Sequence, residues 1–313
     1  MFDIALGILA LIAGILLMTL SSEKAVKHSV ILASALGISP IMIGLLLVSL
    51  GTDLPEIVNS IVSCALGHGN INAGDSIGSV LTQLTLVLGL LPLLGGSFNV
   101  KRREIIVIGA CEILALMLAM SILEKGYVTR SNALFLVGSW PLYIMITRAM
   151  TGGTSKKDAD PIQMSRSKIY HITAAILGFT GVAIGAYLVV QSTIILSAAF
   201  KIPEYLISFF LVAIGTSLPE LAVDLTAIRK KEYELAIGDI IGSCIIDASF
   251  SIGIGQVFFP QTISGDLAIF TSLYTIFASL VVISMLAVRE RVDKKAGAVF
   301  IMLYLLSYSM LAI

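Results

Sequence analysis

The chain has 313 residues, of which 57% are hydrophobic and only 13% are charged, and its formal net charge is zero. Soluble domains carry about 25% charged residues, so this composition excludes an ordinary soluble domain and predicts a polytopic membrane protein. The apolar stretches are continuous and do not alternate in polarity, which favours an all-α protein over a membrane β-barrel. No basic cluster indicates a nucleic acid partner, and the lipid bilayer is the expected environment.

Ten apolar stretches are candidates for transmembrane helices, each of which needs about 20 residues. They cover roughly 3–20, 28–65, 71–96, 103–123, 131–149, 168–197, 203–228, 234–259, 266–288 and 296–313. The first lacks the basic segment and cleavage site of a signal peptide, so we expect it to remain as a helix. Pro40 is a candidate kink in the long second stretch.

Lysine and arginine gather in alternate connections between these stretches. The first, third, fifth, seventh and ninth connections hold all of the 20 basic residues except Lys125, Arg130 and Lys201. Because cytoplasmic loops carry an excess of basic residues, these five connections are predicted to be cytoplasmic. Both termini are then expected outside, in what we expect to be a prokaryotic cell membrane.

One polar connection, 150–167, divides the chain into a first half, 1–149, and a second half, 168–313. With five helices in each half, the second must lie inverted in the membrane, as in many secondary transporters. An internal repeat supports this plan, since an offset of 164 residues relates the halves without a gap. Gly51-Thr52-Asp53-Leu54-Pro55-Glu56 matches Gly215-Thr216-Ser217-Leu218-Pro219-Glu220, and Gly74, Asp75, Ile77, Gly78 and Ser79 match Gly238, Asp239, Ile241, Gly242 and Ser243.

Each six-residue motif places a proline, a hydroxyl group and a glutamate at membrane depth. The proline has no N–H, so the carbonyl of the motif's glycine loses its helical partner. The threonine and the glutamate are four residues apart and share a face. A carboxylate at this depth costs at least roughly 2.5–3.5 kcal/mol. The motif therefore offers oxygen ligands, which hard cations such as Ca²⁺ prefer.

The following helix of each half adds further oxygen atoms. Ser79 and Gln83 are four residues apart on one face, as are Ser243 and Asp247. The aspartate four residues before each serine is interpreted as a capping or vestibule residue, with a ligand role left open.

The candidate centre thus holds four carboxylates, and no lysine or arginine lies within these segments to neutralise them. Two carboxylates about 4 Å apart repel by roughly 4 kcal/mol at an effective dielectric constant of 20. The four cannot all stay ionised when empty, so they must bind cations, take up protons or alternate between the two. Competition of this kind is the physical basis of an antiporter. The carboxylates are those of Glu56, Glu220, Asp247 and Asp53.

Other polar residues at membrane depth carry less information. Glu112 lies alone in the fourth stretch, has no repeat partner and is left unassigned. Asp224 lies one turn beyond Glu220, and we expect an interfacial salt bridge near Arg229. The three cysteines show neither a disulfide framework nor zinc spacing and are expected to be packing residues.

At the two repeated motifs the sequence resembles the sodium/calcium exchanger family of calcium:cation antiporters. Gly-Thr-Ser-Leu-Pro-Glu at 215–220 and Ile-Gly-Ser at 241–243 look like the family's repeat signatures, and 51–56 with 77–79 look like the other copy. The resemblance implies Na⁺-driven Ca²⁺ antiport at four clustered sites, with the first and sixth helices sliding over a core. It implies no enzymatic activity, no resident cofactor and no obligatory protein partner.

By matching position, the resemblance also implies a ligand set. Both ions would bind Glu56 and Glu220. The carbonyl groups of Thr52 and Thr216 would bind Ca²⁺. The Na⁺ sites would be completed by Ser79, Ser243, Ser49, Ala213, Ser217 and Asp247.

Two residues depart from the family pattern, Asp53 in place of serine and Gln83 in place of asparagine or aspartate. The added carboxylate and the longer amide leave K⁺ co-transport, proton coupling or another divalent ion open. Two alternatives come from other classes. A channel would need a continuous pore. An intramembrane aspartyl protease would need a Gly-x-Gly-Asp pattern, where 236–239 reads Ala-Ile-Gly-Asp. The short linker favours a prokaryotic-type protein without cytosolic Ca²⁺-sensor domains.

Overall fold

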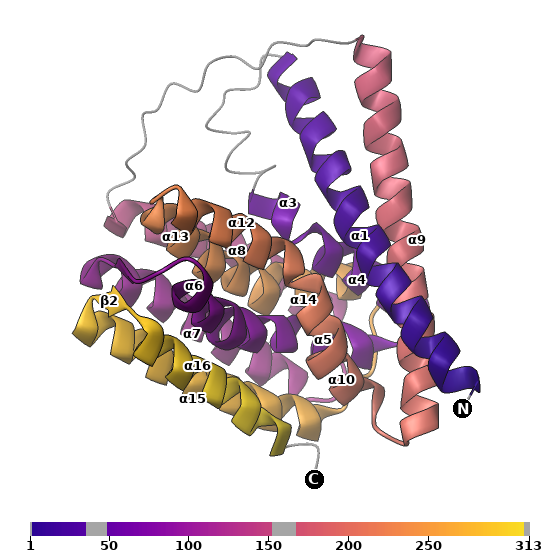
Figure 1. Ribbon diagram of the computed structural model, residues 1–313. Coiled ribbons are helices and arrows are strands. Elements are labelled where there is room, and N and C mark those ends of the chain that lie inside the picture. The colour runs from indigo at the N-terminus through magenta and orange to yellow at the C-terminus, as the bar shows by residue number, and fades with distance from the viewer. Residues whose placement is uncertain (1, 36–48, 152–166, 310–313) are drawn as a thin grey trace.

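The computed structural model describes residues 2–35, 49–151 and 167–309. Two long helices, α1 (Phe2–Ala35) and α9 (Lys168–Phe200), pack against each other and stand at one side of the molecule (Figure 1). Gly14 and Gly185 lie at their contact, where a side chain on either glycine would collide with the opposite helix. The two helices occupy matching places in the two halves of the chain.

The course of α1 corrects the prediction that the first helix ends near residue 20 and the second begins near residue 28. Residues 21–35 continue α1, and Pro40 lies outside the described residues. The polar residues Glu23, Lys24 and Lys27 suggested a loop, but all three are exposed on the helix surface. Lysine, glutamate and alanine are good helix formers, so a helix can continue through them.

The helices that carry the six-residue motifs are broken inside the motif. Asp53 separates the short helix α3 from α4, and Ser217 separates α11 from α12. In each case the residue two positions later is proline, which removes the hydrogen bond that would have continued the helix. The elements are α3 (Ser49–Thr52), α4 (Leu54–Ala65), α10 (Glu204–Ile207), the π-helical segment η3 (Ser208–Val212), α11 (Ala213–Thr216) and α12 (Leu218–Arg229).

The helix that follows in each half contains a π-helical segment at its middle. Gln83 and Asp247 lie in these segments, which are frequent at functional sites. The elements are α5 (Gly69–Leu81), η2 (Thr82–Val87), α6 (Leu88–Leu94), α13 (Tyr233–Ile246), η4 (Asp247–Ser251) and α14 (Ile252–Phe258).

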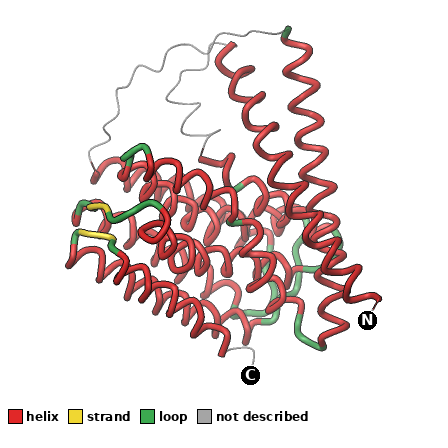
Figure 2. Tube along the Cα trace, viewed as in Figure 1, coloured by secondary structure: helices red, strands yellow, loops and turns green. Residues whose placement is uncertain are grey.

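Four further helices pack around the broken and π-helical segments. Two very short strands join the connections at one end of the molecule (Figure 2). Seven helices within the described ranges are long and apolar enough to cross a membrane, and Leu54–Ala65 is a shorter apolar helix. The remaining elements are α7 (Arg102–Leu123), α8 (Arg130–Thr151), α15 (Gly265–Arg289), α16 (Lys294–Ser307) and the antiparallel strands β1 (Phe98–Asn99) and β2 (Arg291–Val292). The seven helices and Leu54–Ala65, together with α8 and α16, make up the ten-helix, all-α plan.

The two halves interlock at the centre through close backbone contacts. A Cβ atom on Gly74 would overlap the carbonyl oxygen of Tyr205, and one on Gly78 would overlap the carbonyl oxygen of Phe209. Helix α5 of the first half therefore lies directly against α10 and η3 of the second. Such contact between helices requires small residues.

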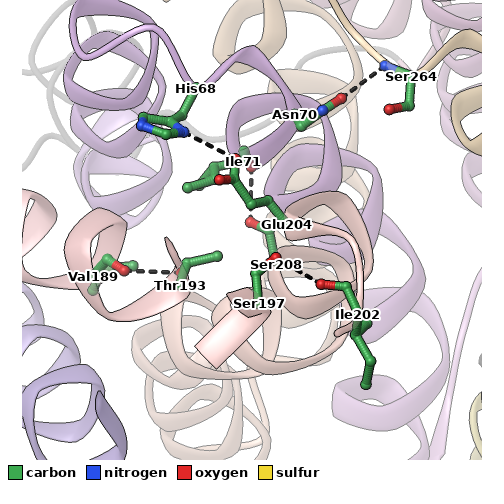
Figure 3. A network of polar contacts seen from close by, with 10 residues as sticks. All are labelled: His68, Asn70, Ile71, Val189, Thr193, Ser197, Ile202, Glu204, Ser208 and Ser264. Carbon is green, nitrogen blue, oxygen red and sulfur yellow. Dashed lines mark hydrogen bonds and ion pairs between the residues drawn. The ribbon is translucent and has the colours of Figure 1, made fainter. Parts of the chain in front are cut away.

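The end of the molecule that carries Lys201 is held together by polar contacts between the halves (Figure 3). Nδ1 of His68 lies 2.9 Å from Oε2 of Glu204. The hydroxyl of Ser208 donates to the carbonyl of Ile71 at 2.8 Å, and the backbone N–H of Ser264 donates to Asn70 at 2.7 Å. These contacts close that end around α5 and α10.

Candidate functional site

Glu56 and Glu220 lie in the first turns of α4 and α12, immediately after the helix breaks. Their side chains are 1% and 0% exposed, and their carboxylate oxygens accept no hydrogen bond within the described part of the chain. The two carboxylates are close enough for their charges to repel each other. The first turn of a helix stabilises negative charge. This stabilisation only partly offsets the free-energy cost of burying two carboxylates.

Asp53 occupies the break itself and faces the second half of the chain. Its Oδ2 accepts a hydrogen bond of 3.2 Å from the hydroxyl of Ser243 on α13, while its Oδ1 accepts none from the described residues. Its carboxylate is close enough to those of Glu56 and Glu220 for the negative charges to repel each other. The structure thus brings three predicted carboxylates together around one centre.

Gln83 and Asp247 meet across the centre, and they are the two members of one repeat pair. Nε2 of Gln83 donates to Oδ2 of Asp247 at 3.1 Å, and Oε1 of Gln83 accepts from the thiol of Cys244 at 3.3 Å. Oδ1 of Asp247 accepts no hydrogen bond from the described residues. Both side chains are fully buried.

Asp75 belongs to this centre, although the sequence left its role open between capping, vestibule and ligand. Its carboxylate accepts hydrogen bonds from Asn59 at 2.6 Å and from the hydroxyl of Thr216 at 3.2 Å. Thr216 lies beside Glu56 and is also 3.4 Å from the hydroxyl of Ser79. The prediction from the sequence did not include Asn59. Its position three residues after Glu56, on the same face of α4, could have identified it.

The remaining predicted residues have less uniform surroundings. Ser217 is buried, and its hydroxyl has no partner among the described residues. The carbonyl of Ala213 accepts the backbone N–H of Ser217 at 3.2 Å. Thr52 lines the cavity described below. The side chain of Ser49 lies outside the described residues.

The carbonyl of Gly51, which Pro55 leaves without a helical partner, is not free in this structure. It accepts a hydrogen bond of 3.2 Å from the hydroxyl of Ser22 on α1. This contact ties the broken helix of the first half to the long helix pair. It could not be foreseen from the motif, because the donor comes from a different helix.

Asp224 differs from its prediction, since it makes no ion pair with Arg229 or any other described residue. It is fully buried and lies close to Asp239 and Asp53. The reason is its position four residues after Glu220, which puts both carboxylates on the inward face of α12. The centre therefore contains more acidic side chains near α12 than the sequence suggested.

The ion pairs found among the described residues all lie near helix ends, away from this acidic centre. The centre is instead a mixture of carboxylate, hydroxyl, amide and carbonyl groups. Within the described ranges, no three acidic, histidine or cysteine side chains are spaced so as to hold a metal ion by themselves.

A cavity of about 630 Å³ lies between α1, α3, α12 and α13 and borders the two six-residue motifs. Thr52 and Pro219 of the two motifs line it, as do Lys27 of α1 and, in the connection between α12 and α13, Lys230 and Glu232. This end of the molecule, which carries the predicted cytoplasmic basic residues, is called the basic end below. The cavity extends from the basic end to the two motifs, and the buried carboxylates of the centre do not line it.

Comparisons with known proteins agree with this architecture. The profile of the family described as "Sodium/calcium exchanger protein" matches residues 6–148 and 170–312. The putative antiporter CaxA of Alkalimonas amylolytica is 27% identical over 248 residues, which are 74% of this chain and 75% of that protein. The sodium/calcium exchanger MaX1 of Methanosarcina acetivorans is 31% identical over 133 residues, covering 42% of this chain and 38% of that protein.

Solved structures of the sodium-calcium exchanger NCX_Mj show the same fold. One, soaked with Na⁺ and Sr²⁺, superimposes with a TM-score of 0.62 and 26% identity over 98% of both chains. Because the family profile covers both halves and nearly the whole length, this chain belongs to the sodium/calcium exchanger family.

Proposed function

We propose that this protein is a secondary-active antiporter that exchanges Ca²⁺ for Na⁺ across the membrane. The observation that carries the proposal is the pair Glu56 and Glu220, two buried carboxylates without hydrogen-bond partners among the described residues. Unpartnered carboxylates at membrane depth are costly unless a cation or a proton neutralises them. The sodium/calcium exchanger family supports the same activity, and the putative antiporter CaxA, at 27% identity, supports antiport.

The two carboxylates would hold either one Ca²⁺ or Na⁺ ions, and neighbouring oxygen atoms would complete the coordination. Ca²⁺ takes six to eight oxygen ligands in a flexible arrangement, so hydroxyl and carbonyl groups must join the acids. The full proposed set is Glu56, Glu220, Asp247, Asp53, Thr52, Thr216, Ser79, Ser243, Ser217, Gln83, Ser49 and Ala213. Asp75 joins the proposal as the residue that orients Thr216.

Exchange follows from the electrostatics of this set. Several acidic groups in one buried centre repel each other strongly when no cation is bound. The state without cations is therefore unfavourable, and one ion leaves readily only as others replace it. A transporter that cannot easily change between its inward- and outward-facing states without a bound cation couples the transport of the two ions.

Alternating access would use the long helix pair as the moving part. We propose that α1 and α9 slide over a core formed by the other helices of the two halves, 1–149 and 168–313. The basic end would face the cytoplasm and both termini the outside, with 150–167 as the cytoplasmic linker. Support for this proposal comes from the cavity at the basic end and from the polar contacts that join the halves at the opposite end. The acidic centre between them is buried.

Ca²⁺ flux in proteoliposomes tests this function directly. An outward Na⁺ gradient is expected to drive Ca²⁺ uptake, because Na⁺ leaving the vesicle frees the carboxylates for Ca²⁺. Uptake should be absent with equal Na⁺ on both sides. Parallel vesicles with a K⁺ or H⁺ gradient examine the alternative coupling ions. Uptake that follows only one of these gradients, or single-channel currents, would contradict Na⁺/Ca²⁺ antiport.

Asp53 should set the divalent affinity, because its repeat partner is the uncharged Ser217. Asp53→Ser is expected to keep exchange but to raise the Ca²⁺ concentration for half-maximal flux about fivefold or more, as one negative charge is lost. Ser79→Ala removes a hydroxyl without a charge, and we expect a smaller shift from it. An unchanged Ca²⁺ dependence in Asp53→Ser would place Asp53 outside the ion site.

A further inference from the structure

Asp75 and Asp239 are equivalent carboxyl groups in the two halves, one helical turn away from proposed ion ligands. The offset of 164 residues relates them, and each lies four residues before a serine of the proposed ion site, Ser79 on α5 or Ser243 on α13. Residues four apart share one face of a helix and are about 6 Å apart along its axis. Helix α5 begins at the end that carries Lys201, called the outer end here, and α13 begins at the basic end. The two aspartates therefore lie on opposite sides of the acidic centre.

Asp75 is covered on the outer side of the centre. Its side chain is 1% exposed, and its Oδ2 accepts a hydrogen bond of 2.6 Å from Nδ2 of Asn59 on α4. Its Oδ1 accepts one of 3.2 Å from the hydroxyl of Thr216 on α11. Because the opposite orientation of the Asn59 amide would direct an oxygen at a carboxylate, Oδ1 of Asn59 must point away, and it has no partner among the described residues. The amide N–H group thus competes with any cation for Oδ2 of Asp75.

Asp239 is not covered in this way on the basic side. It is partly exposed, and its Oδ2 accepts no hydrogen bond from the described residues. The position equivalent to Asn59 is held by Val223, which has no side-chain donor. Asp224 lies at the same level of the α12–α13 hairpin and close to Asp239, is fully buried, and has no described partner for either oxygen. Two adjacent carboxyl groups without donors need a cation or a shared proton, and carboxylate oxygens suit hard cations.

The difference between the two aspartates matches the difference between the two ends of the molecule. The outer end is closed by the polar contacts of His68, Asn70 and Ser208 (Figure 3), whereas a cavity lies at the basic end. Neither aspartate can cap its helix, because neither lies in the first turn. A carboxyl that is covered at the closed end and partly exposed at the open end is suited to receive ions, and capping does not explain it.

We propose that Asp239, together with Asp224, is an entry site for the transported cations on the cytoplasmic side, and that Asp75 is the entry site on the outer side. The proposal rests on the proposed function and on the orientation given there. A cation from the cytoplasm binds at Asp239 and then passes along the face of α13 to the centre. A cation from outside displaces the Asn59 amide from Asp75 and passes along α5. Asn59 thus covers the outer entry site while the outer end is closed.

The test measures Ca²⁺ uptake separately at the two faces of the membrane. Everted vesicles present the cytoplasmic face to added Ca²⁺ and right-side-out vesicles present the outer face, and both are loaded with Na⁺. Asp239→Asn and Asp75→Asn each remove one charge and keep the size of the side chain and one acceptor oxygen. Glu290→Gln at the basic end and Asp266→Asn at the outer end are the matched controls, because both are exposed acids outside the proposed ion site.

We expect Asp239→Asn to raise the Ca²⁺ concentration for half-maximal uptake about fivefold or more in everted vesicles. In right-side-out vesicles the same variant should stay within about twofold of wild type. Asp75→Asn should show the reverse, with its shift confined to right-side-out vesicles. Fivefold corresponds to the interaction of two unit charges about 4 Å apart in water. The two controls should leave the half-maximal concentration unchanged on both faces.

Asn59→Val gives the first half the residue that the second half has at this position, and it uncovers Asp75. We expect it to lower the half-maximal Ca²⁺ concentration about 3- to 10-fold in right-side-out vesicles only, the range that corresponds to one hydrogen bond. An unchanged or raised concentration there would contradict the role given to Asn59. If Asn59→Val does not fold, the two Asp→Asn variants still test the entry sites.

Shifts of equal size on both faces, which a ligand of the centre or a residue that acts only through Thr216 would produce, would overturn the inference. The absence of a shift in Asp239→Asn or Asp75→Asn would overturn it as well. Wild-type vesicles that transport normally while the variants behave in either of these ways leave the proposed function in place. Wild-type vesicles without Na⁺-driven Ca²⁺ uptake would contradict the proposed function, and the inference with it.

Discussion

Replacing Glu56 or Glu220 by glutamine is expected to reduce Na⁺-driven Ca²⁺ flux to below about 1% of wild type. A unit charge about 4 Å from a cation contributes roughly 4 kcal/mol at an effective dielectric constant of 20, which is about a thousandfold in binding. A divalent ion loses more binding free energy than a monovalent ion does. The amide keeps the volume and one oxygen but removes the charge, so the measurement isolates electrostatics. Flux is measured in proteoliposomes at saturating Na⁺ and Ca²⁺ gradients.

Folding of these variants should be intact, because neutralising one of several repelling acids relieves strain in the cation-free protein. We expect an equal or higher unfolding temperature without cations and a lost response to added Ca²⁺. Glu112→Gln is the matched control, since it makes the same substitution at another buried carboxyl in the membrane-spanning core. Full transport in Glu56→Gln or Glu220→Gln would remove these residues from the site.

Gly78→Ala is expected to separate the two halves at their closest contact and to abolish transport. The added Cβ would overlap the carbonyl oxygen of Phe209 and lie 2.8 Å from Cβ of Ala213. The obstacle is mainly backbone, which cannot turn aside as a flexible side chain can. Overpacking of this kind costs about 1–3 kcal/mol or more. It also moves Ser79, the next residue, away from Thr216. Unfolding temperature in detergent and Ca²⁺ flux are the two measurements.

Gly138→Ala supplies the control for the loss of a helical glycine. Gly138 lies inside α8, and apart from the adjacent residues and backbone of its own helix, no atom of the described residues lies within 4 Å of the Cβ that would be added. Alanine is more favourable than glycine within a helix by about 1 kcal/mol, so this variant should be as stable as wild type or slightly more. Equal behaviour of the two alanine variants would mean that the contact between α5 and η3 does not hold the halves together.

Much of the architecture could be predicted from the chain alone, because its causes are local. Long apolar stretches, alternating basic connections and one constant offset between the halves each depend only on residue type and spacing. The helix breaks before Pro55 and Pro219 also follow from a local cause, the missing N–H group. The grouping of carboxylates was predicted through the repeat, since two inverted copies of one motif meet at the axis that relates them.

The tertiary structure decided the pairings between side chains that lie far apart in the chain. The carbonyl of Gly51 is taken by Ser22, Asp75 holds Thr216, and Asp53 accepts from Ser243. None of these partners has a fixed spacing, so no periodicity could predict them.

The same reason accounts for the two departures from expectation. α1 continues through Lys24 and Lys27 because those charges reach the surface along the helix, and a loop is not required. Asp224 turns inward because the face of α12 that it shares with Glu220 is buried. What the sequence by itself determined was the membrane class, the inverted repeat and the identity of the acidic motifs. What only the tertiary structure decided was the partner of each polar group, because a buried hydrogen bond depends on which helices come together.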